Sequence, residues 1–150
     1  MARAACVGAA LASACAPIDR ARQCEAFAEA VNPALAKIEA QTKSLGRVPS
    51  GADAGRTALA QIQHLVEIAE SYEALSKTME ALEPTDTKLK PVAKDMAKLY
   101  GKTAKTARSI ARNVEKSQLK ALGGASRRLE RQKREQDTLV KRAKRICKTK

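Results

Sequence analysis

The chain has 150 residues, enough for one domain with a modest core, and its composition is poor in aromatic residues (2%) and rich in Ala, Leu, Lys, Arg and Glu, which is typical of helices packed on helices. No stretch approaches the roughly 18 consecutive apolar residues of a membrane-spanning helix, which excludes such a helix from the mature protein. The formal net charge of +13 is unevenly distributed, with −2 on residues 1–84, +7 on residues 85–122 and +8 on residues 123–150. This asymmetry favours an anionic partner. The alternative is a solvated basic surface that only aids solubility.

The first residues have the pattern of a short export signal. Met1 and Arg3 supply a positive start, and residues 4–14 (AACVGAALASA) supply a small-residued apolar segment. Ala12-Ser13-Ala14 fits an A-x-A cleavage site, and together with Cys15 it resembles a bacterial lipobox, although that motif usually has Leu where this chain has Ala12. We therefore expect residues 1–14 to be a cleaved signal peptide and Cys15 to be lipidated. The alternative is a cytosolic protein that keeps an Ala-rich first helix.

Three short breaks divide the chain after Pro17 into four helix-length segments. The breaks are Leu45–Gly55, which holds three Gly and a Pro, Leu82–Asp86, a Pro turn with Thr85 and Asp86 as cap-forming residues, and Gly123–Ser126, a Gly pair followed by Ser as an N-cap. Because none of the breaks is a long linker, consecutive helices should be antiparallel neighbours. The sequence predicts an all-α fold, an antiparallel up-down-up-down four-helix bundle spanning residues 15–150.

Apolar residues at helical spacing support this prediction and indicate the buried faces. In the first segment they are Cys24, Ala28, Val31, Leu35, Ile38, Thr42 and Leu45. In the second they are Leu59, Ile62, Val66, Ala69, Tyr72, Met79 and Leu82. The third segment has Leu89, Val92, Met96, Leu99, Ile110 and Val114, with small or polar residues in its middle. The fourth has Leu129, Leu139, Ala143 and Ile146, interrupted by Gln132 and Gln136. We expect this last helix to be the least tightly packed.

The four cysteines point to one disulfide. They form no C-x-x-C motif and have no neighbouring His, so a zinc site is not indicated. Export would remove Cys6 and lipidation would use Cys15, which leaves Cys24 and Cys147 as an even pair. In an up-down-up-down bundle the start of the first helix and the end of the fourth lie at the same end. We therefore predict a Cys24–Cys147 disulfide; the alternative is two unpaired thiols.

The cysteine-bearing ends also carry a resemblance. RQCEAFAEAVNPAL (Arg22–Leu35) and EQDTLVKRAKRICK (Glu135–Lys148), with the lipobox-like start, resemble the ends of small, uncharacterised helical lipoproteins or secreted proteins of proteobacteria, especially myxobacteria. The similarity lies in the layout of the ends and helix lengths. It implies an envelope protein of unknown activity and assigns no catalytic residue.

Residue patterns for catalysis or cofactor binding are absent from the sequence. His64 is the only histidine, and no Glu-x-x-His pair accompanies it, so no metal ligand is predicted. No G-x-S-x-G motif occurs, and GGASRR (Gly123–Arg128) lacks the Lys-Ser/Thr element of a phosphate-binding loop. We expect no catalytic residue, no cofactor and no small-molecule substrate, and hence a protein that is not an enzyme.

Basic residues recur every three or four positions along the third and fourth segments. The predicted anion-binding surface consists of Lys94, Lys98, Lys102, Lys105, Arg108, Arg112, Arg127, Arg128, Arg131, Arg134, Lys141, Arg142 and Arg145. We expect its partner to be an anionic membrane or cell-wall surface, or an acidic protein. Nucleic acid is the second choice, because aromatic residues for base stacking and any recognised module are lacking.

The sequence thus predicts an exported, non-enzymatic protein of the bacterial envelope, either periplasmic or an outer-membrane lipoprotein. The alternative is a cytosolic helical protein that associates with nucleic acid or serves as a coiled-coil adaptor. The oligomeric state stays open.

Overall fold

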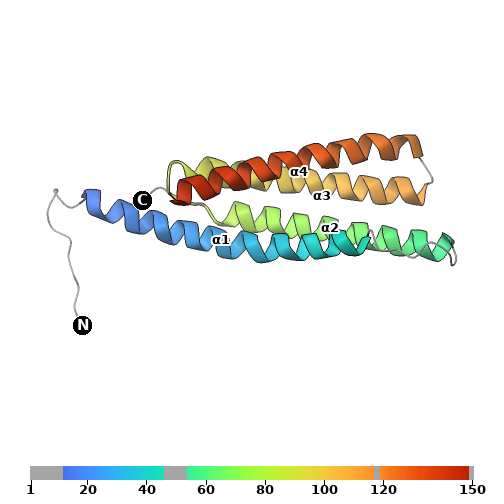
Figure 1. The fold of residues 1–150 in the computed structure, drawn as a ribbon, viewed down its shortest axis with the longest axis horizontal. Helices are drawn as coiled ribbons and strands as arrows, with labels where there is room; N and C mark the ends of the chain where they lie inside the picture. Colours follow the sequence, from blue (N-terminus) through green and yellow to red (C-terminus); the bar gives the residue numbers. More distant parts are fainter. Residues whose placement is uncertain (1–11, 46–53, 117–118, 149–150) are drawn as a thin grey trace.

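A computed structural model describes residues 12–45, 54–116 and 119–148 of the chain. Within these residues the secondary structure consists of four helices, α1 (Ala12–Leu45), α2 (Ala54–Ala81), α3 (Leu89–Glu115) and α4 (Leu119–Lys148). The helices lie side by side and alternate in direction, so that the start of α1, the α2–α3 connection and the end of α4 share one end of the molecule (Figure 1). The predicted antiparallel four-helix bundle is confirmed.

Helix α3 lies at the centre of the packing. Its apolar face buries Leu89, Met96, Leu99 and Tyr100 almost completely. Because α3 is in contact with both α2 and α4, it needs a wide buried face. The small and polar residues in the middle of α3, which the sequence suggested would weaken the seam, lie inside this face.

The close contact between α2 and α3 depends on those small residues. Gly101 of α3 faces Ser76 of α2, whose Oγ would lie 3.3 Å from a Cβ at position 101. The same hydroxyl donates a hydrogen bond to the carbonyl oxygen of Ala97 at 2.8 Å. Thr103 and Thr106 are buried and donate to carbonyl oxygens of their own helix at 2.9 and 3.0 Å, so their hydroxyls are satisfied.

The predicted buried face of α2 is partly wrong. Leu59 and Val66 are 68% and 36% exposed, whereas Leu65, Ile68 and Leu75 are buried. The buried residues follow the heptad Leu65, Ile68, Tyr72, Leu75, Met79, which faces the centre of the bundle. The two exposed residues lie to one side of this seam.

The third predicted break is also wrong. α3 ends at Glu115 and α4 begins at Leu119, so Gly123, Gly124 and Ser126 lie inside α4 instead of forming a turn with a Ser N-cap. The α4 seam explains this: Leu122, Ala125 and Leu129 already have the spacing that continues to Leu139, Ala143 and Ile146. Burying Leu122 and Ala125 requires the helix to begin before the Gly pair, and packing outweighs the weak helix propensity of Gly.

The α2–α3 connection is built as the sequence predicts. Glu83 has a left-handed backbone with φ of 33°, which ends α2, and Pro84 is buried behind it. Asp86 then caps α3, since its Oδ1 accepts hydrogen bonds from the backbone N–H groups of Lys88 and Leu89, both at 2.9 Å. Thr85 does not cap the helix and instead contacts α1.

Candidate functional site

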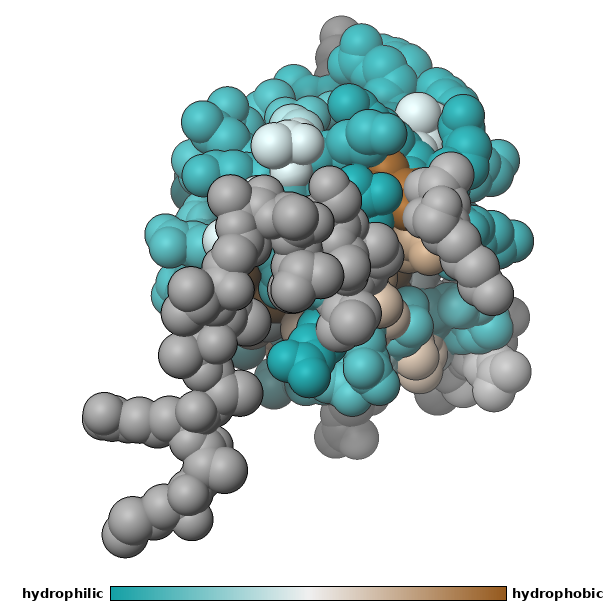
Figure 2. Space-filling view, turned by 90° about the vertical axis from the view of Figure 1, so that its left-hand side faces the viewer, coloured by the Kyte–Doolittle hydropathy of each residue, from teal (hydrophilic) through white to brown (hydrophobic). Residues whose placement is uncertain are grey.

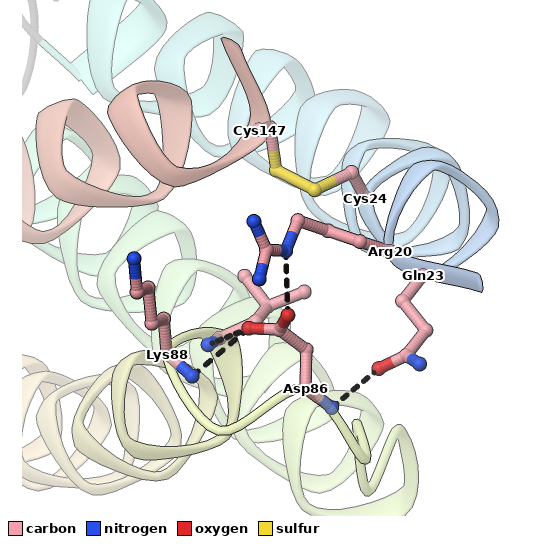
Figure 3. The surroundings of a disulfide bond; sticks show 7 residues. Arg20, Gln23, Cys24, Asp86, Lys88 and Cys147 are labelled. Carbon is pink, nitrogen blue, oxygen red and sulfur yellow. Dashed lines mark hydrogen bonds and ion pairs between the residues drawn. A yellow bond between two sulfur atoms is a disulfide. The ribbon is translucent and has the colours of Figure 1, made fainter. Parts of the chain in front are cut away.

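The structure joins α1 to α4 by a disulfide between Cys24 and Cys147, the pair that the cysteine count pointed to. The Sγ–Sγ distance is 2.08 Å and the Cα–Cα distance is 5.7 Å, within the usual range for a disulfide. Cys24 lies about three turns inside α1 and Cys147 lies in the last turn of α4, so the bond ties the end of α4 to the body of the bundle (Figure 3).

A polar network next to the disulfide fixes α1 to the α2–α3 turn. Arg20 Nε donates to Asp86 Oδ2 at 2.6 Å, and the backbone N–H of Asp86 donates to Gln23 Oε1 at 2.9 Å (Figure 3). Gln23 Nε2 also donates to Thr85 Oγ1 at 2.8 Å and to Asp19 Oδ2 at 2.6 Å. Asp86 thus caps α3 and binds two side chains of α1.

The electrostatics of Asp86 reflect these contacts. Burial acts to raise the pKa of its carboxyl group, but the hydrogen bonds from Arg20 and from the backbone of Leu89 and Lys88 outweigh it and lower the pKa below its usual value. The charged carboxylate is therefore the form that the folded protein favours. In a view of this end, the visible surface of the described residues is mostly hydrophilic, with a small apolar area near its middle (Figure 2).

The predicted basic residues of α3 occupy one side of the helix. Lys94, Lys98, Lys102, Lys105 and Arg112 are all exposed and alternate with the buried residues that face the core. They extend over 18 residues, about 27 Å of helix at 1.5 Å per residue. Because spacings of three, four and seven residues keep them on one side of the helix, they form a stripe with a gap of two turns between Lys105 and Arg112.

The basic residues of α4 form a second stripe beside the first. All seven are exposed: Arg127, Arg128, Arg131, Arg134, Lys141, Arg142 and Arg145. α3 and α4 are in contact along their lengths, and Gln132 Nε2 donates to Thr106 Oγ1 across the interface at 3.2 Å. We call the exposed basic residues of both helices the basic face.

Arg108, which the sequence also assigned to this surface, differs from its other members because it is ion-paired within the bundle. Its guanidinium pairs with Glu73 of α2 and its side chain is only partly exposed. The hydrogen bond and the charge of Arg108, with a smaller contribution from Lys77, lower the pKa of Glu73. Through this ion pair, Arg108 contributes to the interface between α2 and α3.

The positive charge of the basic face is largely uncompensated. Lys98, Lys102 and Lys105 form no ion pair with any residue that the structure describes. Like charges at this spacing repel one another by a few tenths of a kcal/mol per pair, about 0.2–0.5. An external anion or counterions would relieve this repulsion.

The remaining sequence predictions concern the signal peptide with its cleavage site and the surroundings of His64. The proposed cleavage site Ala12–Ala14 lies at the start of α1, whereas residues 1–11 and the side chain of Cys15 lie outside the described residues. Among the described residues, His64 Nδ1 lies 3.5 Å from Glu67 Oε2, and no three His, Cys, Asp or Glu side chains gather to hold a metal ion. No described helix has the length and hydropathy needed to cross a membrane.

The sequence analysis did not find the network around Asp86. Its only sequence signal is the cap-forming Asp86 in the Pro turn, since nothing in the sequence places Arg20 or Gln23 opposite it. Comparisons of the chain with protein-family models, with curated proteins and with solved structures give no match.

Proposed function

We propose that this protein is a non-enzymatic component of the bacterial envelope that binds an anionic surface through its basic face. The observation that carries the proposal is the presence of two exposed basic stripes on adjacent helices. Within the described part of the chain, Lys98, Lys102 and Lys105 have no ion-pair partner. A surface of this kind recognises closely spaced negative charges and needs no shaped pocket. Lipid headgroups provide such charges.

The N-terminal signal supports a membrane as the partner. A diacylated Cys15 would supply one membrane attachment and the basic face a second. The two acyl chains of a diacylglyceryl group anchor a protein by themselves, so the basic face would hold the bundle against the anionic bilayer surface. Basic residues near an anionic bilayer contribute about 1 kcal/mol each at moderate salt. The disulfide between Cys24 and Cys147 is consistent with an oxidising compartment outside the cytoplasm.

Binding to vesicles tests the basic face. The variant combines Lys98→Gln, Lys102→Gln and Lys105→Gln. The matched control combines Arg22→Gln, Lys37→Gln and Lys77→Gln, which removes the same charge from exposed positions on α1 and α2. At about 1 kcal/mol per residue, the first variant should bind phosphatidylglycerol-containing vesicles roughly 100-fold more weakly than the unmodified protein.

The control should lose much less, because its charges lie on the other helices. Equal losses in both variants would show that net charge alone drives binding and would contradict a specific basic face. Failure of the unmodified protein to bind anionic vesicles, together with salt-dependent retention of duplex DNA, would favour the cytosolic nucleic-acid protein instead.

A further inference from the structure

α1 and α4 separate beyond the disulfide and leave a cavity between them. The two helices meet near Cys24 and Cys147 but are in little contact elsewhere. The space between them is a cavity of about 640 Å³, open along one side, which falls in the usual size range of small-molecule sites. Its lining comes from all four helices: Leu35, Ile38, Glu39, Thr42, Leu45, Leu65, Ile68, Tyr72, Thr103, Ala107, Ser126, Leu129, Glu130, Lys133, Gln136 and Asp137.

Small and polar side chains at seam positions create this cavity. α3 presents Thr103 and Ala107 to it and α4 presents Gln136, where a tightly packed bundle would place larger apolar residues, and the exposed Ser126 lines its edge. The disulfide fixes the spacing of α1 and α4 at one end only. The floor therefore keeps apolar surface on the partly buried Leu35, Leu45 and Leu129, above the buried Leu65 and Ile68.

The floor suits an alkyl chain. Its larger residues are aliphatic. The Thr103 hydroxyl donates its hydrogen bond to the carbonyl oxygen of Leu99 in its own helix, so it offers no free donor to a ligand. Burial raises the pKa of the Tyr72 hydroxyl, which keeps this ring neutral. The lining of α1 runs from Leu35 to Leu45, about 15 Å along the helix, so the cavity is elongated like an extended chain.

The rim carries charges of both signs. Glu130, Lys133 and Asp137 follow one another on α4. On α1, Glu39 forms an ion pair with Lys43 at 2.8 Å and is influenced more weakly by the charge of Lys133. Residues 123–150 contain only three acidic residues, and two of them are at this rim. The rim is thus the one part of α4 where acidic and basic side chains alternate, unlike the uniformly positive basic face.

We propose that the cavity binds a single-chain zwitterionic amphiphile of the lysophospholipid class. The alkyl chain lies along the floor between α1 and α4. The head group stays at the rim, with its cationic part towards Glu39, Glu130 or Asp137 and its phosphate towards Lys133. This site is separate from the basic face and does not rest on the proposed function.

Dodecylphosphocholine below its micelle concentration serves as the probe, titrated into the full chain with its disulfide intact and followed by calorimetry. Ser126→Trp places a large ring in the cavity, and Thr138→Trp places the same ring on the exposed side of α4 as the control. The unmodified protein and the control should bind one equivalent, and Ser126→Trp should bind about tenfold more weakly or worse, the loss expected when about two CH₂ groups are excluded.

Two further measurements test whether a loss of probe binding reflects the cavity itself. Bound probe should raise the unfolding temperature of the unmodified protein and of the control, but not of Ser126→Trp, whose own unfolding transition shows that it is folded. The Lys98, Lys102 and Lys105 variant should bind the probe as well as the unmodified protein does, even if vesicle binding is lost. Absence of saturable binding, or equal binding by both Trp variants, would overturn the proposal. A dimer that Ser126→Trp converts to a monomer would also overturn it, because a second copy would then fill the cavity.

Discussion

Removal of the Cys24–Cys147 disulfide should destabilise the protein strongly. The bond closes a loop with a sequence separation of 123 residues. In the chain-entropy model the loss of loop-closure entropy in the unfolded state amounts to about 5 kcal/mol at 25 °C for a loop of this length. The bond matters for α4 in particular, because this helix buries only Ala125, Leu139 and Ala143 among its described residues and is in little contact with α1.

The assay is urea unfolding of Cys24→Ser/Cys147→Ser, followed by the helical circular dichroism signal. Both this variant and its reference carry Cys6→Ser and Cys15→Ser, so that no other thiol can pair. The free energy of unfolding should fall by about 4–5 kcal/mol and the midpoint temperature by about 10–20 °C. Reductant should lower the stability of the reference to that of the variant and leave the variant unchanged. A loss below about 1 kcal/mol would refute the view that the disulfide holds α4 in place.

Three smaller changes test other details of the packing. Gly123→Ala and Gly124→Ala should each stabilise the protein by about 1 kcal/mol in urea unfolding, because both residues lie inside α4 with room for a Cβ; a turn at this site would give a loss instead. Asp86→Ala should cost about 1–2 kcal/mol and Asp86→Asn less, since Asn keeps the cap. Because the folded state lowers the pKa of Asp86, the charged carboxylate stabilises the folded protein above about pH 4. This stabilisation should disappear on further acidification of the unmodified protein, and neither Asp86 variant should show the same loss. Tyr100→Phe should leave stability unchanged or raise it by about 1 kcal/mol, since the buried Tyr100 hydroxyl finds no hydrogen-bond partner among the described residues.

Helix order, the first two breaks and the α3 cap could be predicted because they depend on local chemistry. Leu45–Gly55 and Leu82–Asp86 concentrate Gly, Pro and capping residues, which end helices regardless of the tertiary fold. The third break could not be found in this way. α3 ends at Glu115 and α4 begins at Leu119, and the Gly pair at Gly123 and Gly124 is held in the helix by the packing of its neighbours. The heptad that begins at Leu122 is the signal that would have placed this break.

The candidate site was predictable only in part. Exposed Lys and Arg at helical spacing define a stripe from sequence alone, so most of the basic face was identified. Packing decides whether a basic residue of the stripe contacts a neighbouring helix instead of the solvent. Arg108 is an example, because it pairs with Glu73 of α2. The cavity between α1 and α4 depends on the separation of two helices, which no periodicity reveals, although the polar residues at Gln132 and Gln136 indicated a weak seam.

The intact mass of the protein recovered from the envelope of a proteobacterial host, measured without reductant, tests the central claim most directly. The claim is that the protein is exported, anchored at Cys15 and closed by the Cys24–Cys147 disulfide. The account predicts a chain that begins at Cys15, is heavier by a diacylglyceryl group and is lighter by the two hydrogen atoms lost in the disulfide. A chain that retains Met1 or Ala2 and has all four thiols free would contradict export, anchor and disulfide together.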